Sequence, residues 1–586
     1  MININDNFLT LENRKILERR DLARIDLLDK SDIYFRWSPC KVRLLLVVDG
    51  LTFHPSADFG LGQFVDILLA PRFFVRYEIT LANILNVPID SGMLTGDSRI
   101  ARRIVNFKFD VDDHFKADKY DVVFMFGIAS SYESRGVGYP AHDALKNSEL
   151  QRIAEFQNGG GGLFATGDHG ALGKAMCHRV ARARNMRLWQ STLNSVGEDM
   201  VSMAGRYRND TNRRGHDNVS QFNDQSDDIP QSISPVMYTR TSGIFRYSFP
   251  HPVLCSPNGV IRVMPDHPHE GECRVPTNPN LAINFTAALG QEYPAANDGG
   301  ARPLPQIISH NHVASGTTSG GKDPTVGQTF PGLAAYDGHR AGKGIGRVLT
   351  DATWHHYVNV NLTGEDGAAA ADPKGKGFLA SPAGQAVFEE IKTFYRNLPV
   401  WLSPPERIRC MNSRLMWSLI WSDRVLEAVL TARDIGLTKV GASTLSLIGK
   451  HARDVLGRHV GHCQTVKLIL DVVIDRPLFR EIDPWPPFDA DVRTLDDDEV
   501  QLIDLWPVLD AALGGALVKI SEDFPEESGD MTKSLKPEAI MKSGRAGAAI
   551  ALDRVERSAK VSIEKLGASL ASTAAKSARS VKPKKV

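Results

Sequence analysis

Two short apolar runs, at residues 42–48 and 120–127, constrain the fold of this chain more than any other feature of its sequence. The first run is almost uninterrupted and ends at Asp49, and the second repeats its pattern. Such runs are typical of strands that are buried on both faces, as in a parallel sheet. Residues 62–85 between them have a helix-like pattern. The segment therefore predicts a strand–helix–strand unit with a right-handed crossover.

A further alternation of helix and strand follows the second run. Residues 148–158 predict a helix with Ser148 as its N-cap. Residues 163–166 predict a short strand, which a turn at 167–170 joins to another helix at 171–183. Strands that alternate with helices in this order predict an open, mostly parallel sheet flanked by helices.

Residues 200–340 differ from their neighbours because Gly, Pro, Asn, Asp and Ser are abundant there, with only short strand-like pieces such as 259–264. Long loops usually serve a site, so we interpret this segment as a loop-rich insertion. Residues 346–353 then predict the last strand of the sheet. The expected fold class is α/β, followed by a mainly α-helical region.

The sequence divides into regions of different character. Small residues at 368–377 indicate a linker, helices are expected at 384–396 and 405–433, and an amphipathic stretch at 10–30 predicts a leader helix. The expected segments are a helical leader at 1–40, the α/β domain at 41–362, a linker at 363–383, a mainly helical domain at 384–540 and a basic tail rich in Ala and Ser at 541–586.

Lys+Arg and Asp+Glu both number 69, so the chain has no net charge that would attract polyanions to it. The tail from residue 541 is basic, with 11 Lys or Arg against three acidic residues. Nucleic acid is therefore expected to bind only weakly, through this tail. A solvated end is the more usual fate of such a segment.

The cysteines and the apolar segments indicate a cellular compartment. The six cysteines are scattered without a CxxC pair, which disfavours a disulfide framework and a thiolate zinc site. The N-terminus is polar, and no apolar stretch reaches the roughly 18 residues of a membrane span. The sequence therefore predicts a cytoplasmic protein that makes no membrane contact.

The turn Gly167-Asp168-His169-Gly170 is the first candidate for a reaction site. A glycine-bounded turn between strand and helix places side chains at the carboxyl edge of a parallel sheet, where such sheets bind ligands. It also directs the N–H groups of the next helix toward an anion. We predict catalytic roles for Asp168 and His169, and substrate-binding roles for Gly167, Gly170 and Asp49. An ordinary tight turn with a capping aspartate is the alternative.

The second candidate is the segment Asp266-His267-Pro268-His269-Glu270. It holds four potential metal ligands, and Pro268 restricts the backbone between the two histidines. Two histidines and two carboxylates suit zinc, iron or manganese. The alternative is a polar loop whose histidines form local hydrogen bonds.

Two adjacent histidines, His355 and His356, follow the last predicted strand. Their position is expected to bring one of them to the same edge as His169, so we predict a catalytic role for this pair. A pair of core histidines is the alternative. Arg206 and Arg208 lie in the insertion and suit bidentate binding of an anionic substrate, although a solvated loop is the more common fate of such residues.

The glycine-rich strand and turn at 159–171 and the late segment Gly346-Arg347-Val348, followed by His355, resemble the trehalose-utilisation (ThuA-like) branch of the class I glutamine-amidotransferase-like superfamily. The likeness covers residues 41–362 and implies an amidotransferase-like, flavodoxin-like sheet and a carbohydrate-like substrate. In that family the turn presents a cysteine nucleophile, which pairs with a late histidine. This chain has no cysteine in the turn, so glutamine hydrolysis is not expected.

These features predict a hydrolase-like enzyme that acts on a small polar substrate by His/Asp acid–base or metal-assisted chemistry. Asp168 as a nucleophile is one alternative, and Ser130 or Ser131 is another. The competing hypothesis is a catalytically silent binding or sensing module. In either case the region 384–540 is a candidate surface for a protein partner or a second copy.

Overall fold

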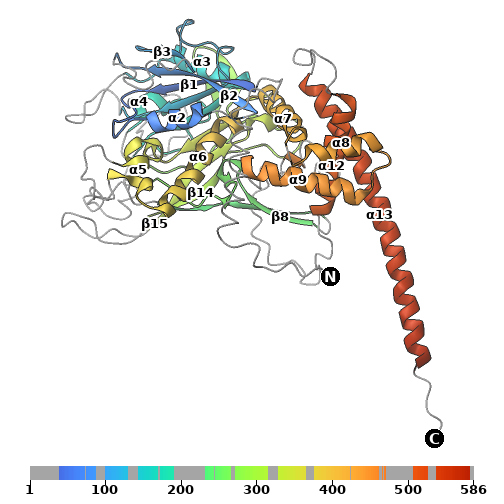
Figure 1. Cartoon of the computed structure of the whole chain (residues 1–586). Coiled ribbons are helices and arrows are strands. Elements are labelled where there is room, and N and C mark those ends of the chain that lie inside the picture. Colours follow the sequence, from blue (N-terminus) through green and yellow to red (C-terminus); the bar gives the residue numbers. More distant parts are fainter. Residues whose placement is uncertain are drawn as a thin grey trace.

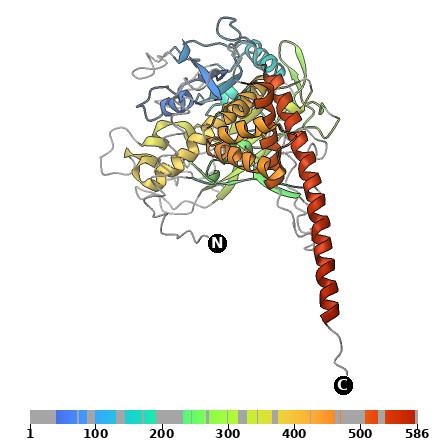
Figure 2. The same ribbon diagram turned by 45° about the vertical axis from the view of Figure 1, so that its right-hand side comes forward.

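The structure, a computed structural model, contains an α/β domain and a group of C-terminal helices, the last of which projects from the body (Figures 1 and 2). It describes residues 39–580 except 71, 73, 87–98, 130–142, 169–171, 190–230, 243–244, 266–270, 298, 314–327, 343, 365–374, 423, 461–464, 466–467, 470–505 and 526–535.

A ten-stranded sheet forms the centre of the α/β domain. Six neighbouring strands are parallel, in the spatial order β3 (Ile100–Ile104), β2 (Val75–Asn83), β1 (Cys40–Val48), β4 (Val122–Phe126), β5 (Gly162–Thr166) and β16 (Val348–Asp351). Four strands extend the sheet beyond β16, each antiparallel to its neighbour, in the order β15 (Gln328–Tyr336), β14 (Gln306–Val313), β6 (Gln231–Pro235) and β11 (Val263–Met264).

Helices cover both faces of the parallel part of the sheet. Side chains of β1 alternate between the faces, as the period of two requires. Leu44 packs on the face covered by α2 (Gly62–Leu69) and α6 (Pro382–Leu402), whereas Leu45 packs on the face covered by α3 (Asn147–Asn158). This two-sided burial explains the apolar run in the sequence and confirms the predicted α/β class.

The spatial order of the parallel strands reverses between β1 and β4. β2 and β3 lie on one side of β1, and β4, β5 and β16 lie on the other. In open α/β sheets the carboxyl ends of the strands near such a reversal form the usual ligand crevice. The edge that holds the ends of β1, β4, β5 and β16 is therefore where a site is expected.

The helix predicted at 62–85 is wrong in its second half, because α2 ends at Leu69 and β2 follows. The first residues of β2 alternate between buried and exposed, a period of two that belongs to a strand. The helix predicted at 171–183 is also wrong in length, since only α4 (Lys174–Cys177) forms there.

Ser148 is not the N-cap of α3. Lys146 occupies the N-cap, and its backbone N–H donates to the Glu149 carboxylate at 3.0 Å. The Ser148 hydroxyl instead donates to Asp110 at 2.6 Å. The helix itself, Asn147–Asn158, matches the predicted 148–158 closely.

The predicted insertion at 200–340 contains more sheet than the sequence suggests. β6, β11, β14 and β15 come from this segment and join the main sheet. Three two-stranded ladders accompany them: β7 (Met237–Ser242) with β8 (Phe245–Pro250), β9 (Cys255–Ser256) with β10 (Gly259–Val260), and β12 (Ala282–Asn284) with β13 (Ala288–Gln291). The segment therefore widens the sheet as well as adding loops.

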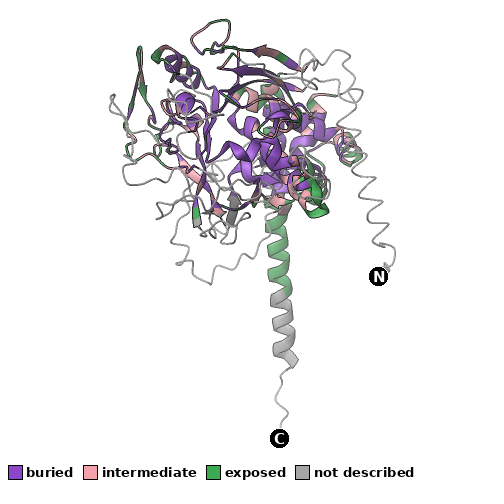
Figure 3. Ribbon diagram, turned by 90° about the vertical axis from the view of Figure 1, so that its left-hand side faces the viewer, coloured by how far each residue is buried: buried purple, intermediate pink, exposed green. Residues whose placement is uncertain are grey.

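Helices make up most of the described chain after β16. The single helix predicted at 405–433 is divided into two. The described α-helices after β16 are α5 (Asn359–Thr363), α6, α7 (Pro405–Ile420), α8 (Leu426–Ile435), α9 (Ala442–Val460), α12 (Trp506–Asp523) and α13 (Pro537–Ser580). α6 packs against α2 and β5, whereas α12 packs against α8, α9 and α13. Most of α12 is buried, as Figure 3 shows for the helical region (purple).

Cys40 and Cys410 form a disulfide that joins β1 to α7. The sequence pattern disfavours a disulfide framework and did not predict this single pair, because 370 residues separate two cysteines that the packing of α7 on β1 brings together. Within the described part of the chain, each helix is too short or too polar to cross a membrane.

Candidate functional site

Glycines in the turn after β5 allow backbone segments to pack closely against one another. A Cβ on Gly167 would lie 2.4 Å from the carbonyl oxygen of Leu172, and a Cβ on Gly173 would lie 2.7 Å from Gly167 Cα. Gly173 also has a φ of 88°, which favours glycine. The Asp168 N–H donates to the Leu172 carbonyl at 3.1 Å and closes the turn. This packing fixes Asp168 at the end of β5.

The pairing of β5 with β16 brings Asp168 beside Thr353. Thr166 lies opposite Asp351 in this parallel ladder. Asp168 comes two residues after Thr166, and Thr353 comes two residues after Asp351, so these two residues also lie side by side. The Thr353 hydroxyl donates to Asp168 Oδ1 at 2.7 Å and accepts the N–H of His355 at 2.9 Å. Thr353 therefore caps the 3-10 helix η8 (Trp354–Tyr357) and holds the aspartate at the same time.

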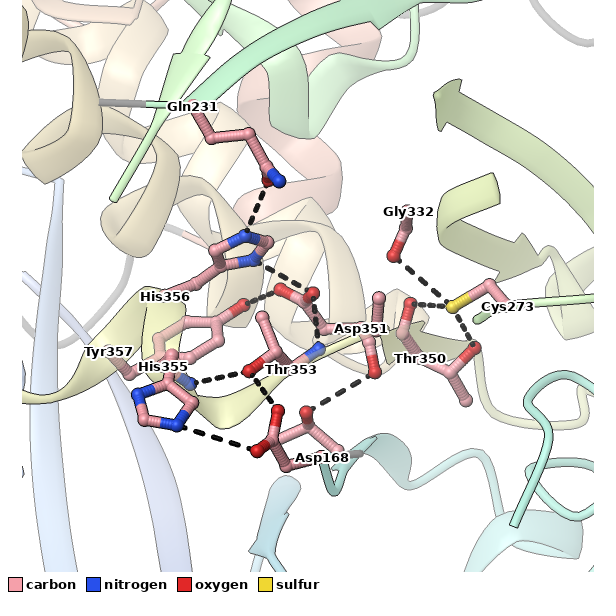
Figure 4. Close-up of polar contacts among 12 residues, drawn as sticks. Asp168, Gln231, Cys273, Gly332, Thr350, Asp351, Thr353, His355, His356 and Tyr357 are labelled. Atoms are coloured by element: carbon pink, nitrogen blue, oxygen red, sulfur yellow. Dashed lines mark hydrogen bonds and ion pairs between the residues drawn. The ribbon is translucent and has the colours of Figure 1, made fainter. Parts of the chain in front are cut away.

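His355 lies against the other oxygen of Asp168 (Figure 4). Its Nε2 is 3.4 Å from Asp168 Oδ2, and its Nδ1 is 3.3 Å from Asn361 Oδ1. The ring stacks on Trp354 with a centroid distance of 4.0 Å. Both ring nitrogens thus face oxygen atoms, an arrangement that a doubly protonated imidazole satisfies on both sides.

Phe59 packs against the His355 ring. Its ring lies edge-on to His355 at 5.8 Å and to Trp354 at 6.0 Å. Phe59 is 48% exposed, whereas His355 is only 3% exposed. The buried histidine is therefore in contact with a partly exposed aromatic side chain.

His356 belongs to a second, separate network around Asp351. His356 Nδ1 lies 2.9 Å from Asp351 Oδ1, and the Tyr357 hydroxyl donates to Asp351 Oδ2 at 2.7 Å. His356 Nε2 lies 3.2 Å from Gln231 Oε1 of β6. Burial raises the pKa of Tyr357 well above its usual value, with the Asp351 charge acting in the same direction. The adjacent histidines thus contact different carboxylates (Figure 4).

Arg187 connects the two strand ends, although no motif or spacing in the sequence points to it. Its Nη2 donates to the Asp168 carbonyl at 2.7 Å, and its Nε donates to the Asp351 carbonyl at 3.1 Å. The guanidinium lies 4.6 Å from the Trp189 ring. Burial lowers the pKa of Arg187 below its usual value. A buried guanidinium therefore holds both backbone segments of the site through their carbonyl groups.

Asp49, predicted to bind substrate, contacts the backbone of the neighbouring loop. Its Oδ1 accepts the N–H of Ile128 at 2.6 Å and that of Ala129 at 3.2 Å. Asp49 thereby fixes the chain after β4 at the carboxyl edge. This carboxylate oxygen has a structural role in the arrangement observed.

The buried thiols nearest to this edge are poorly suited to act as nucleophiles. Burial raises the pKa of Cys177 well above its usual value, and it also raises that of Cys273. The Cys273 thiol contacts the carbonyl of Gly332 at 3.2 Å. Since the thiolate is the reactive form of cysteine, the raised pKa keeps both thiols in the unreactive form.

Several predicted site residues lie outside the described residues. They are Ser130, Ser131, His169, Gly170, Arg206, Arg208, Asp266, His267, His269 and Glu270. Of the predicted residues that are described, Asp168 and His355 come together, His356 lies in the adjacent network, and Gly167 forms the turn. Among the described residues, no three or more His, Cys, Asp or Glu side chains are grouped so that they could hold a metal ion.

Comparison of the chain with family models, with curated proteins and with solved structures gave no match.

Proposed function

We propose that this protein is a hydrolase-like enzyme in which His355 acts as general acid and base on a small polar substrate. The observation that carries the proposal is the Asp168–His355 pair, which two adjacent strand ends place at the carboxyl edge of the sheet. A carboxylate next to a histidine orients the ring and stabilises its protonated form during proton transfer.

In this proposal Nδ1 of His355 exchanges the proton with water or substrate. Nε2 faces Asp168, whose second oxygen is occupied by the Thr353 hydroxyl, so this side holds the ring in place. Nδ1 faces Asn361 at 3.3 Å, a long contact that a bound water or substrate hydroxyl replaces. Displacement of the half-exposed Phe59 admits the substrate to this nitrogen.

The substrate class rests on the sequence. The resemblance to the ThuA-like branch supports a carbohydrate-like molecule, and His169 and Gly170 directly follow Asp168 in the sequence. Arg206 and Arg208 suit a substrate that carries a negative charge.

A metal-assisted form of the same proposal uses zinc, manganese or iron. Asp266, His267, His269 and Glu270 supply the donor set, and the metal would activate water. Plasma mass spectrometry of the purified protein tests this form. Near-stoichiometric metal that falls in a His267→Ala/His269→Ala variant supports it, and a metal-free protein leaves acid–base chemistry without a metal.

The test of the acid–base proposal is hydrolysis of p-nitrophenyl glycosides and p-nitrophenyl acetate by the full chain. We expect His355→Gln to lower kcat/KM by about 10²- to 10⁴-fold, the usual contribution of a general acid–base. His114→Gln, which alters a histidine in the segment between β3 and β4 that stacks on Phe107, is the matched control and keeps the activity of the wild type. Equal activity of His355→Gln and wild type contradicts the proposal.

A catalytically silent binding module is the second candidate, and burial favours it. Asp168, Asp351 and His356 are fully buried, and each contacts polar partners within the protein. Networks that satisfy themselves in this way usually stabilise a fold. Hydrolysis that never exceeds the uncatalysed rate, together with a lower thermal stability of His355→Gln, supports this second candidate.

A further inference from the structure

The last helix, α13, carries a regular row of small and apolar residues that continues beyond the body of the protein. Successive members are three, four and four residues apart, and the cycle then repeats. The row, called the α13 stripe below, consists of Met541, Gly544, Ala548, Leu552, Val555, Ala559, Ile563 and Leu566. An 11-residue repeat of this kind keeps one face of a helix toward a partner over its whole length.

The first half of the α13 stripe already forms an interface. Met541, Ala548 and Leu552 are 8%, 1% and 9% exposed, and α13 packs there against α12. The contact is close because glycines allow it: a Cβ on Gly547 would lie 2.2 Å from the carbonyl oxygen of Gly515. The same side of the helix is therefore an established packing surface.

The second half of the α13 stripe has no such cover among the described residues. Every residue from 556 to 569 is exposed, and Ile563 and Leu566 are 66% and 60% exposed. Figures 2 and 3 show this part of α13 standing clear of the body. A helix without packing partners is only marginally stable in water, so a long apolar-striped extension indicates a missing partner.

We propose that the exposed half of the α13 stripe packs against the α13 stripe of a second copy of this chain, which makes the protein a homodimer. The face is continuous with the α12 interface and has the same spacing, so it presents the surface that already packs against a helix. A twofold dimer buries the same residues of both copies at once. Residues 553–566 hold four basic and three acidic residues. This near balance of charge favours packing against a protein helix over binding to a polyanion.

The test is the mass of the full chain in solution, measured by sedimentation equilibrium over a series of protein concentrations. We expect the wild type to have twice 64.4 kDa and the Ile563→Asp/Leu566→Asp variant to have 64.4 kDa. Val561→Asp is the matched control, because Val561 is 47% exposed on the same helix but lies about half a turn away from Ile563. This variant places an aspartate on the opposite side of the same helical segment and should retain the dimer.

Three results would overturn the proposal. The first is a wild type with the mass of one chain at every concentration. The second is a double variant that keeps the mass of two chains, since another surface would then hold the dimer. The third is dissociation of Val561→Asp together with the double variant, since loss of helix would then explain both. A one-chain wild type that binds duplex DNA would assign α13 to nucleic acid instead.

Discussion

Gly449 of α9 shows how closely the C-terminal helices pack, and replacing it with alanine tests this packing. A Cβ on Gly449 would lie 1.7 Å from the carbonyl oxygen of Asp510 in α12. The obstacle is backbone, so no side-chain rotation relieves it and the two helices must separate. Gly457 lies in the same helix, and a Cβ there would meet no described atom within 4 Å. The two glycines thus differ in packing while sharing a helical backbone.

We expect the two substitutions to change the stability of α9 in opposite directions. Helix propensity favours alanine over glycine by about 0.8–1 kcal/mol, which applies at both positions. Overpacking costs about 1–3 kcal/mol, and at Gly449 a backbone clash places the cost at the upper end. Gly449→Ala should therefore destabilise α9 by roughly 1–2 kcal/mol. Gly457→Ala should stabilise it by about 0.8 kcal/mol.

Amide hydrogen exchange of peptides from α9 measures this difference locally, which suits a large chain whose global unfolding is not two-state. A change of about 1.4 kcal/mol alters the opening equilibrium tenfold, so exchange should become about tenfold faster in Gly449→Ala. In Gly457→Ala it should become several-fold slower. Slower exchange in both variants would refute the argument, because propensity alone would then decide the outcome.

Three further predictions concern other parts of the molecule. Burial lowers the pKa of His178 to about 4. The unfolded chain binds a proton there below its ordinary pKa of 6.5. The local stability around this histidine should therefore fall as the pH drops from about 6.5 toward 4, by up to about 3 kcal/mol, when it is measured by amide hydrogen exchange corrected for the intrinsic pH dependence of exchange. His178→Gln should lack this fall, and an equal fall in both proteins would contradict the assignment to His178. Tyr357→Phe removes the hydroxyl that donates to Asp351, so we expect a loss of about 1–2 kcal/mol in the local opening free energy measured by amide hydrogen exchange of β16, and an unchanged value would contradict the hydrogen bond. Reduction should expose two additional thiols from the Cys40–Cys410 disulfide and lower the melting temperature, whereas an unchanged thiol count would contradict the pairing.

Local patterns were sufficient to predict the parallel core. The apolar runs that became β1 and β4 have no polar face, and such strands are stable only where helices cover both sides of a sheet. Local patterns were insufficient for β2 and for the strands of the insertion. Glu78 and Thr80 interrupt the apolar residues of β2, so the pattern of residues 62–85 is compatible with both a helix and a strand. The hydrogen bonds of β2 with the neighbouring strand β1 stabilise the extended conformation.

The sequence by itself determined the elements on which the site depends: a glycine turn after one strand, carrying Asp168, and two histidines after another. Only the tertiary structure decided between the histidines. His355 faces Asp168 and His356 faces Asp351, although the two are adjacent in the chain. The choice follows from the register of β5 with β16, which joins Thr353 to Asp168 across 185 residues. A contact between residues so far apart in the sequence depends on how the whole sheet assembles, and no local pattern encodes it.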